Sequence, residues 1–436
     1  MRGTWHWFML AVSVCMAVCA VWMAWHLARG GAEGSRDQSV SCAFYLWQRR
    51  WSPEMREAAR RAAPYARSFM VLSGEIDARR RDLVATHVHP AWEILAETRT
   101  PVTLVFRADV SLAARLEDSA ARAAAANYLA CLAKRKLEEA SAAGVNVAGI
   151  QLDYDCPTAG LSRYAQLLGE LELDRNRTAL SITVLPTWLG SDAFRELVAG
   201  LDYYVLQVHS LERPSTIDDG TVLCRTERIP GYLALANAYP TPFYLALPTY
   251  GYELAYDRSG RFLGLAAEGP RPDWAAGTRI RAVSADPADL ARVVRDTQTA
   301  PPEHLCGIVW FRLPVEGDRL NWPWPTLLAV MGGRVPEVSL AAEIRRPEDG
   351  LFEVWIRNIG ECAPAGPVEV HIGCDRRGIQ ARDLLNGFAE TSISATGFHL
   401  LGPAPPPGGE ILAGWYRCQG DGLTHCAAQL RQEDPS

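Results

Sequence analysis

The sequence lacks any long run of basic residues, and it has no excess of positive charge. Lys and Arg together number 44 against 50 Asp and Glu, which gives a net charge of −6. Nucleic-acid binding needs a basic patch or stripe, so we expect no nucleic-acid partner. The chain also lacks the composition of a disordered protein, because 48% of its residues are hydrophobic and 22% are charged. Its 436 residues suffice for two or three domains.

Two further absences limit the cofactors. No glycine-rich phosphate loop follows the first apolar run, which removes the best argument for a dinucleotide fold. No cysteines have the spacing of zinc ligands. Asp153 and Asp155 with His209 offer donors for a divalent cation, but no other ligands cluster near them in the sequence. We therefore expect neither a cofactor nor a metal.

Most cysteines are scattered among apolar neighbours, where they are typical of small buried hydrophobic residues. Two pairs are close in sequence within the last hundred residues, and they are the disulfide candidates: Cys362 with Cys374, and Cys418 with Cys426.

The N-terminal 30 residues contain a long apolar stretch, from Trp5 to Ala28. It exceeds the apolar core of most signal peptides and is long enough to span a bilayer, with tryptophans at both ends. Residues 1–30 are predicted to be an uncleaved membrane anchor, with a signal cleaved after Ala20 or Ala32 as the alternative. A polar linker over residues 31–40 follows. The expected location is the cell envelope, on the extracytoplasmic or periplasmic side of the inner membrane.

From residue 41 to residue 333, eight apolar strand-like runs alternate with helix-like segments. The runs are Ala43–Gln48, Ser68–Ser73, Val102–Arg107, Val147–Tyr154, Ala179–Leu185, Tyr203–Val208, Phe243–Pro248 and Gly307–Leu313. This number and rhythm predict an α/β fold, a (β/α)₈ TIM-type barrel, with a doubly wound open sheet as the rival. Residues 337–436 change to short alternating runs separated by Pro, Gly and Asn, which predicts a small C-terminal all-β sandwich of the fibronectin or immunoglobulin kind.

The segment VAGIQLDYDCP, residues 147–157, indicates where the site lies. On a strand, Gln151, Asp153 and Asp155 share one face, and a parallel barrel places its ligand site at the carboxyl ends of its strands. Applying the same alternation to the other runs gives a carbohydrate-like lining of aromatic and polar residues. Besides the three just named, its members are Gln48, Glu75, Asp77, Arg107, Trp188, Gln207, His209, Tyr250, Tyr252, Trp310 and Arg312.

Asp153 and Asp155 suit acid–base chemistry. Two carboxylates about 7 Å apart at the backbone resist ionising together, so that one of them can keep a proton near neutral pH. Alternatively, both aspartates cap loop amides or pair with Arg107 and Arg312.

The run AGIQLDYDCP resembles the fourth-strand signature of chitinase-like family-18 glycoside hydrolases, Asp-Gly-Ile-Asp-x-Asp-x-Glu followed by an aromatic residue and Pro. Gly149, Ile150, Asp153 and Pro157 match. The resemblance implies a barrel in which Asp155 replaces the proton-donating Glu, Asp153 is its partner, and Trp310 corresponds to the tryptophan that floors the sugar site. It departs at Ala148 and Gln151, where acids are expected, and in the sixth strand, which reads LQVHS.

The chain as a whole, with QLDYD, LPTYGY and GIVWFRLPVEGDRLNWP, resembles more closely the bacterial domain of unknown function 3142, over roughly residues 42–331. That resemblance implies a barrel and no particular chemistry. Two hypotheses follow. The first is a cell-envelope glycoside hydrolase that acts on a polysaccharide, with Asp155 as acid, Asp153 as its partner, and Glu75 or a substrate acetamido group as the second catalytic group. The second is a non-catalytic, membrane-anchored barrel that binds a glycan.

Overall fold

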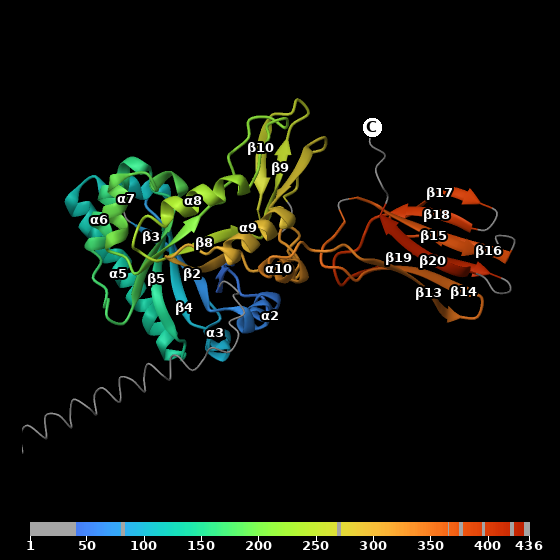
Figure 1. Cartoon of the computed structure of the whole chain (residues 1–436), viewed down its shortest axis with the longest axis horizontal. Helices are drawn as coiled ribbons and strands as arrows, with labels where there is room; N and C mark the ends of the chain where they lie inside the picture. Colours follow the sequence, from blue (N-terminus) through green and yellow to red (C-terminus); the bar gives the residue numbers. More distant parts are fainter. Residues whose placement is uncertain are drawn as a thin grey trace, which may run out of the picture. The chain divides into compact units, whose positions relative to one another are not determined.

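Figure 1 shows a computed structural model of the chain, which describes residues 41–79, 83–267, 272–364, 366–374, 378–394, 397–418 and 423–430. The predicted anchor over residues 1–30 and linker over residues 31–40 lie outside the described residues. Within the described ranges, no helix is both long enough and apolar enough to cross a membrane.

Eight parallel strands form a closed ring. They are β1 (Cys42–Leu46), β2 (Ser68–Asp77), β4 (Val102–Ala108), β5 (Val147–Tyr154), β6 (Ala179–Val184), β7 (Tyr203–Gln207), β8 (Phe243–Pro248) and β12 (Leu305–Phe311). β1 pairs with both β2 and β12, which closes the ring. The eight predicted strands and the (β/α)₈ barrel are confirmed. The open-sheet alternative is wrong, because β1 has a parallel neighbour on each side.

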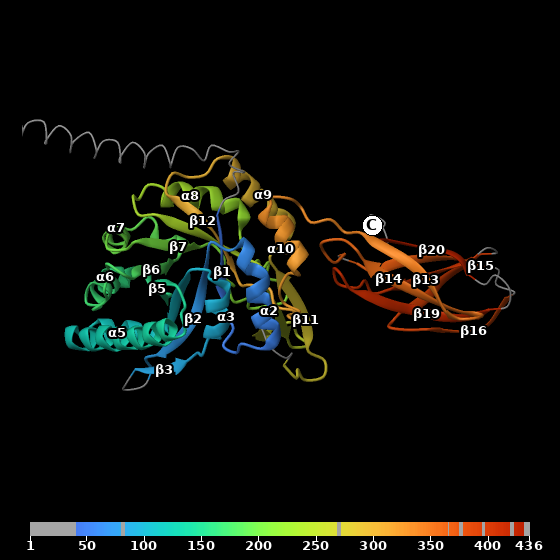
Figure 2. The ribbon, with the colours of Figure 1, turned by 90° about the horizontal axis from the view of Figure 1, so that it is seen from below.

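Helices follow the strands around the outside of the ring, as Figures 1 and 2 show. They are α2 (Pro53–Ala62), α3 (Trp92–Thr98), α4 (Ala113–Leu116), α5 (Ser119–Ala142), α6 (Leu161–Gly169), α7 (Asp192–Ala199), α8 (Ile229–Ala236), α9 (Pro287–Thr299) and α10 (Trp324–Met331). Asp286 caps α9 by accepting from the backbone N–H groups of Ala288 and Asp289. Gly144 ends the α5 turn at φ +77°, a conformation that favours glycine.

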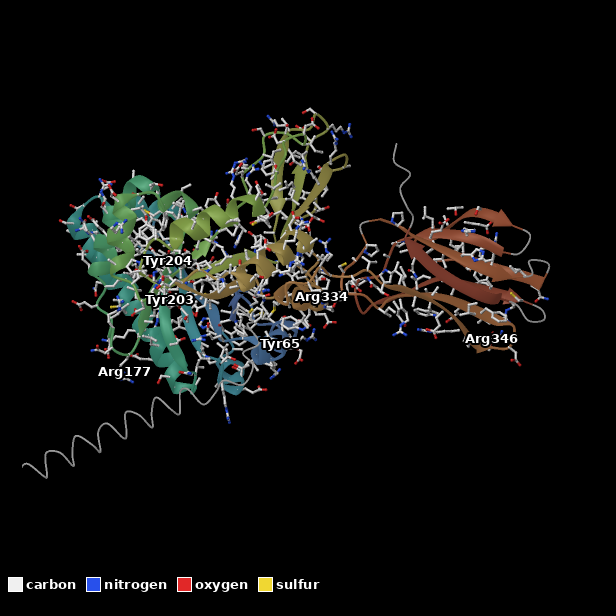
Figure 3. All side chains as sticks on the ribbon, viewed as in Figure 1. Tyr65, Arg177, Tyr203, Tyr204, Arg334 and Arg346 are labelled. Atoms are coloured by element: carbon white, nitrogen blue, oxygen red, sulfur yellow. The ribbon has the colours of Figure 1, made fainter. Side chains whose placement is uncertain are left out.

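Alternate side chains of each strand divide between two apolar layers. Figure 3 labels Tyr203 and Tyr204, consecutive residues of β7. Tyr204 packs against Phe194 of α7, with the ring centroids 5.6 Å apart, in the layer between strands and helices. The Tyr203 hydroxyl lies 3.0 Å from Thr103 Oγ1 of β4, which is not adjacent to β7, so this hydrogen bond crosses the barrel interior. The inner layer is filled and is not a pore.

Two additions to the barrel were not predicted. β3 (Val84–His87) runs antiparallel to the end of β2. Between β8 and α9, three antiparallel strands form a separate sheet: β9 (Gly251–Tyr256), β10 (Phe262–Ala266) and β11 (Arg279–Ser284). Because this sheet follows β8, it arises at the carboxyl-end face of the barrel.

The C-terminal region contains two four-stranded antiparallel sheets, in the order β13-β14-β19-β16 and β17-β18-β15-β20. The bounds are β13 (Leu340–Glu348), β14 (Leu351–Asn358), β15 (Val368–Cys374), β16 (Ile379–Leu384), β17 (Ala389–Ser394), β18 (Gly397–Gly402), β19 (Glu410–Cys418) and β20 (Leu423–Leu430). Buried residues of both sheets, such as Val354 and Leu400, share one core. The predicted all-β sandwich is therefore confirmed.

The two predicted disulfides are not formed, because Cys362 and Cys418 are free thiols. Cys362 Sγ instead faces the carbonyl oxygen of Pro336 at 3.5 Å. Cys418 is buried at the end of β19, in the core that the two sheets share.

Candidate functional site

Two adjoining cavities open at the carboxyl ends of the barrel strands. The first, of about 680 Å³, is lined by Asp153 and Asp155, and we call it the aspartate cavity. The second, of about 480 Å³, is lined by four arginines, and we call it the arginine cavity. Both are lined by Trp47, Arg107, Tyr250, Tyr252, Ala267 and Phe311. They are therefore two halves of one cleft.

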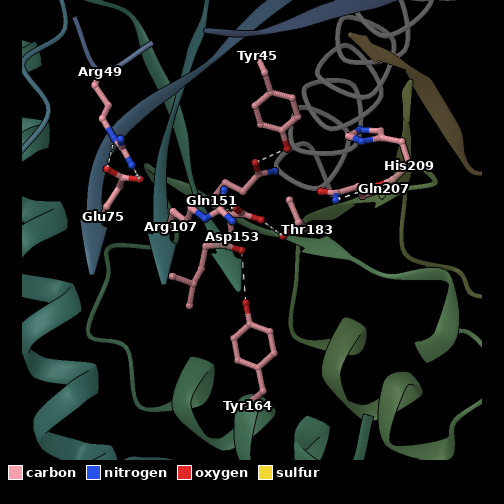
Figure 4. A network of polar contacts seen from close by, with 11 residues as sticks. Tyr45, Arg49, Glu75, Arg107, Gln151, Asp153, Tyr164, Thr183, Gln207 and His209 are labelled. Atoms are coloured by element: carbon pink, nitrogen blue, oxygen red, sulfur yellow. Dashed lines mark hydrogen bonds and ion pairs between the residues drawn. The ribbon is translucent and has the colours of Figure 1, made fainter. Parts of the chain in front are cut away.

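Asp153 lies near the end of β5 and is 8% exposed at the base of the aspartate cavity. Thr183 Oγ1 of β6 donates a 2.6 Å hydrogen bond to Asp153 Oδ1, and Arg107 Nε of β4 lies 3.9 Å from Oδ2 (Figure 4). Burial raises the pKa of the Asp153 carboxyl, and the positive charge of Arg107 opposes that rise without cancelling it. Asp153 therefore keeps its proton to a higher pH than an ordinary aspartate.

Asp155 follows the end of β5 and is exposed on the wall of the same cavity. Within the described part of the chain it forms no ion pair, so its carboxylate faces the space that a ligand would fill. The turn that carries it is fixed by Trp188, whose indole N–H donates a 3.1 Å bond to the carbonyl oxygen of Cys156. The prediction that Trp188 lines the site is wrong, because this bond and its contact with Tyr164 bury it below the turn.

Charges alternate across three neighbouring strands at the cleft. Glu75 of β2 is in register with Arg107 of β4, and Arg107 is in register with Asp153 of β5. Glu75 is also held by Arg49 in a two-bond fork, at 2.6 and 2.8 Å (Figure 4). The guanidinium of Arg107 therefore has one carboxylate on each side, Glu75 on β2 and Asp153 on β5.

The other acids of the arginine cavity are also engaged: Asp77 accepts from Arg79 at 2.9 Å, and Asp109 accepts from the backbone N–H of Ser111 at 3.0 Å. Arg312 donates to Asp318, outside the cavity lining, at 2.6 Å. Of the alternative in which the aspartates pair with arginines, the Arg107 part is present at Asp153. The Arg312 part is wrong, because Arg312 is turned toward Asp318 and is only 3% exposed.

His209 lies at the inner end of a row of three polar side chains. The Tyr252 hydroxyl donates to the Tyr250 hydroxyl at 3.5 Å, and the Tyr250 hydroxyl lies 3.3 Å from His209 Nδ1. Burial lowers the pKa of His209 to about 3, so the ring is neutral. If Tyr250 donates to Nδ1, the ring proton is on Nε2, which is buried without a hydrogen-bond partner among the described residues. The row therefore holds a neutral imidazole behind the two tyrosine hydroxyls at the cavity wall.

Phe311 and Trp47 are the apolar surface shared by both cavities, with their ring centroids 5.1 Å apart. The sequence placed Trp310 and Gln48 here instead. Both predictions are wrong by one residue. Trp310 is fully buried between strands and helices, where it contacts Trp322, and Gln48 lines neither cavity.

Gln151 is also misplaced by the sequence prediction. It faces the barrel interior as expected, but it is fully buried. Its Oε1 accepts a 2.6 Å bond from the Tyr45 hydroxyl (Figure 4). Its Nε2 lies 3.4 Å from Ser181 Oγ. It therefore supports the base of the site and cannot contact a ligand.

The structure brings ten of the predicted residues to the cleft: Glu75, Asp77, Arg107, Asp153, Asp155, Gln207, His209, Tyr250, Tyr252 and Arg312. The sequence missed Trp47, Phe311, Thr183 and Arg213. Thr183 could have been found, because Ser181 and Thr183 alternate with apolar residues on β6 in the same way as Gln151 and Asp153 on β5. In the ranges that the structure covers, no three His, Cys, Asp or Glu side chains are grouped as a metal ion requires.

One protein family matches this chain in sequence. Its description is "domain of unknown function (DUF3142)", and the match covers residues 99–316, from just before β4 to just after β12. No curated protein is similar enough in sequence to count as a match.

Several solved structures are similar to this chain. The chitinase of Chromobacterium violaceum is 16% identical over 67% of this chain and 98% of its own, with a TM-score of 0.49. The spore cortex-lytic enzyme SleL of Bacillus cereus is 14% identical over 68% of this chain and 74% of its own, with a TM-score of 0.48. The family-18 chitinase ChiB of Flavobacterium johnsoniae is 13% identical over 67% of this chain and 93% of its own, with a TM-score of 0.44. Similarity at this level says nothing about the chemistry of this chain, so its function is inferred from its own residues.

Proposed function

The chain belongs to the DUF3142 family, and from that premise we propose that it is a glycoside hydrolase of the cell envelope that acts on a polysaccharide. One observation carries the proposal: a carboxyl group with a raised pKa, Asp153, and an exposed carboxylate, Asp155, line one cavity together with aromatic side chains. Glycoside hydrolysis needs a carboxylic acid that is still protonated at working pH. The apolar faces of sugar rings pack on aromatic side chains.

In this proposal the aspartate pair acts as the general acid. Asp155 faces the cavity and gives its proton to the glycosidic oxygen as the bond breaks. Asp153 lies deeper, and its raised pKa keeps a proton on the pair to higher pH. After each turnover the pair regains its proton from solvent. Thr183 and Arg107 keep the Asp153 carboxyl in place.

The second catalytic group is Glu75 or the substrate itself. Glu75 and Asp153 lie two strands apart, which is roughly 10 Å between Cα atoms for neighbouring strands about 4.8 Å apart. Arg107 of β4 lies in register between them, so in this proposal Glu75 acts on a water molecule, as the base of an inverting enzyme does, and not as a nucleophile. If Glu75 is the base, the product anomer is inverted. If a substrate acetamido group attacks instead, the configuration is retained.

The cell-envelope location and the contact with the membrane are part of the same proposal, and they depend on the apolar stretch Trp5–Ala28. A reporter fused after residue 40 and expressed in a bacterial host tests them. We expect the fusion to be extracytoplasmic and to sediment with membranes until detergent is added.

The deciding experiment is hydrolysis of a panel of bacterial and plant polysaccharides, N-acetylated ones included, by the full chain and by Asp155→Asn. Cleavage that is lost in the variant supports the hydrolase, and NMR of the first anomer released distinguishes Glu75 from a substrate acetamido group. Cleavage that survives in Asp155→Asn would show that Asp155 is not the general acid.

A second function is favoured by one observation, the Arg49 fork, which already neutralises Glu75. A cleft whose second carboxylate is occupied in this way suits binding without turnover. The non-catalytic glycan-binding barrel is supported if the full chain and Asp155→Asn bind the same polysaccharide equally well and neither cleaves it.

A further inference from the structure

We propose that the polysaccharide taken by this cleft carries carboxylate groups, and that Arg213 and Arg107 bind one of them. The inference rests on the proposed function, because it names the substrate class of the same site. It comes from a difference among the five arginines that line the cleft.

Three of these arginines already have close carboxylate partners. Arg49 lies 2.6 Å from Glu75, Arg79 lies 2.9 Å from Asp77, and Arg312 lies 2.6 Å from Asp318. These pairs neutralise the charge of the arginine cavity, and the guanidinium groups are occupied by the protein's own acids.

Arg213 differs from those three. It is exposed in the loop between β7 and α8, and it lines the aspartate cavity. Its guanidinium lies over the ring of Phe262 from β10, 5.1 Å from the ring centroid. Among the residues that the structure describes, no carboxylate lies within ion-pair distance of Arg213. A positive charge is thus held in place at the cavity wall with no partner there.

Arg107 is the second such group. It lies 5.8 Å from the centroid of the Trp47 ring, and its one carboxylate contact among the described residues is the long 3.9 Å approach to Asp153. Its side chain is 46% exposed toward the cleft. Arg107 and Arg213 therefore both line the aspartate cavity with donors that the protein does not use fully.

The aromatic neighbours explain why these arginines suit a carboxylate. A ring beside a guanidinium holds the cation in place without using its N–H groups, which keep the fork geometry that matches a carboxylate. A neutral sugar would offer neither guanidinium a charged partner. With one proton on the aspartate pair, the two arginines also outnumber the remaining negative charge, so an anionic ligand is not repelled.

The experiment compares acidic glycans with their neutral counterparts. Oligosaccharides from polygalacturonate, alginate and hyaluronan are each titrated against the full chain beside the carboxyl-reduced form of the same oligosaccharide, in 50 mM and 500 mM NaCl. We expect at least one acidic form to bind about tenfold more tightly than its reduced form at low salt, with the preference shrinking at high salt.

Variants test which residue causes the preference for the acidic form. Arg213→Gln is expected to remove most of the preference, measured as the ratio of the two affinities, and Arg213→Lys is expected to restore part of it. The matched control is Arg195→Gln. Arg195 also stacks on an aromatic ring, 5.1 Å from the centroid of Tyr239, but it does not line the cleft, so this variant should keep the full preference.

The outcomes separate this inference from the proposed function. Equal binding of acidic and reduced forms overturns the inference and leaves hydrolysis of a neutral glycan possible. A preference that survives Arg213→Gln, or that appears only for sulfated glycans added as a further arm, also overturns it. A carboxylate preference without cleavage of any glycan supports the inference and contradicts the hydrolase. Absence of binding to every glycan overturns both.

Discussion

The two halves of the cleft differ in how their charges are used. In the arginine cavity, Glu75 and Asp77 are each held by an arginine at hydrogen-bond distance. In the aspartate cavity, Asp155 is exposed with no ion pair in the described part of the chain, and Asp153 is buried with a raised pKa. Paired charges stabilise a shape, whereas a strained or unpaired charge is available for chemistry. On the proposed function, proton transfer belongs to the aspartate cavity, and the arginine cavity supplies shape.

The largest expected effect is a difference in kcat between a variant of the aspartate cavity and a variant of the arginine cavity. Asp155→Asn should lower kcat by about 10²-fold or more, because a general acid contributes roughly that much. Asp109→Asn changes an acid that lines the arginine cavity and caps a short turn, which Asn also does. Its kcat should stay within about twofold of the parent, since no proton transfer is assigned to it. A similar loss in both variants would contradict the division.

The next prediction concerns the pH profile. The Thr183 hydroxyl stabilises the charged form of Asp153, so Thr183→Val should raise the pKa of Asp153 further. Since the protonated pair is the active form, the alkaline limb of kcat/KM should move to higher pH. Thr103→Val is the control, because its buried hydroxyl bonds Tyr203 and no carboxylate. A limb that moves to lower pH, or that moves equally in both variants, would argue against Asp153 as the proton store.

A smaller effect is expected at His209. His209→Phe should weaken glycan binding by about tenfold or less, because it removes the partner that holds the Tyr250 hydroxyl at the cavity wall. Because burial lowers the pKa of His209 to about 3, the ratio of variant to parent Kd should be constant from pH 5 to pH 8. Calorimetry at four pH values measures this ratio. If His209→Phe folds poorly, Tyr250→Phe checks the result, because it removes only the hydroxyl that contacts His209. A ratio that changes near pH 6.5 would show that the histidine titrates normally.

The smallest effect is expected for the fork in the arginine cavity. Arg49 is 67% exposed at its side chain, so Arg49→Gln should change the free energy of unfolding by no more than about 1 kcal/mol. Arg60→Gln, which opens a similar fork with Glu97 on the helical surface, is the reference in urea unfolding. A much larger loss at Arg49 alone would mean that the arginine cavity depends on this pair for its fold.

How much of the site could be predicted depended on the polar residues of each strand. On β5, Gln151 and Asp153 alternate with apolar residues, so the inward face was identified correctly from sequence. β1 and β12 are apolar on both faces, because one face meets the barrel interior and the other meets the helices. A continuous apolar run does not tell which of its residues face the barrel interior. For this reason the prediction placed Trp310 where Phe311 lies.

The sheet of β9, β10 and β11 escaped prediction for a different reason. On β10, Leu263 and Leu265 are 47% and 42% exposed, so apolar residues lie on both faces of the strand and alternation does not report its buried face. The exposed face contributes to the cleft wall, while Phe262 packs against the core. The ring of eight strands, by contrast, was predictable because every strand buries apolar side chains in at least one layer.

The pairing of β1 with β12 has a consequence for synthesis on the ribosome. Cys42 is in register with Ile308, so the first barrel strand must wait for the last before its outer edge gains a neighbour. Until then β1 and β8 each present an open row of backbone donors and acceptors, the kind of edge that recruits other chains. A nascent chain of this family is therefore most vulnerable to aggregation just before its eighth strand emerges, and a chaperone that shields strand edges would help it most at that moment.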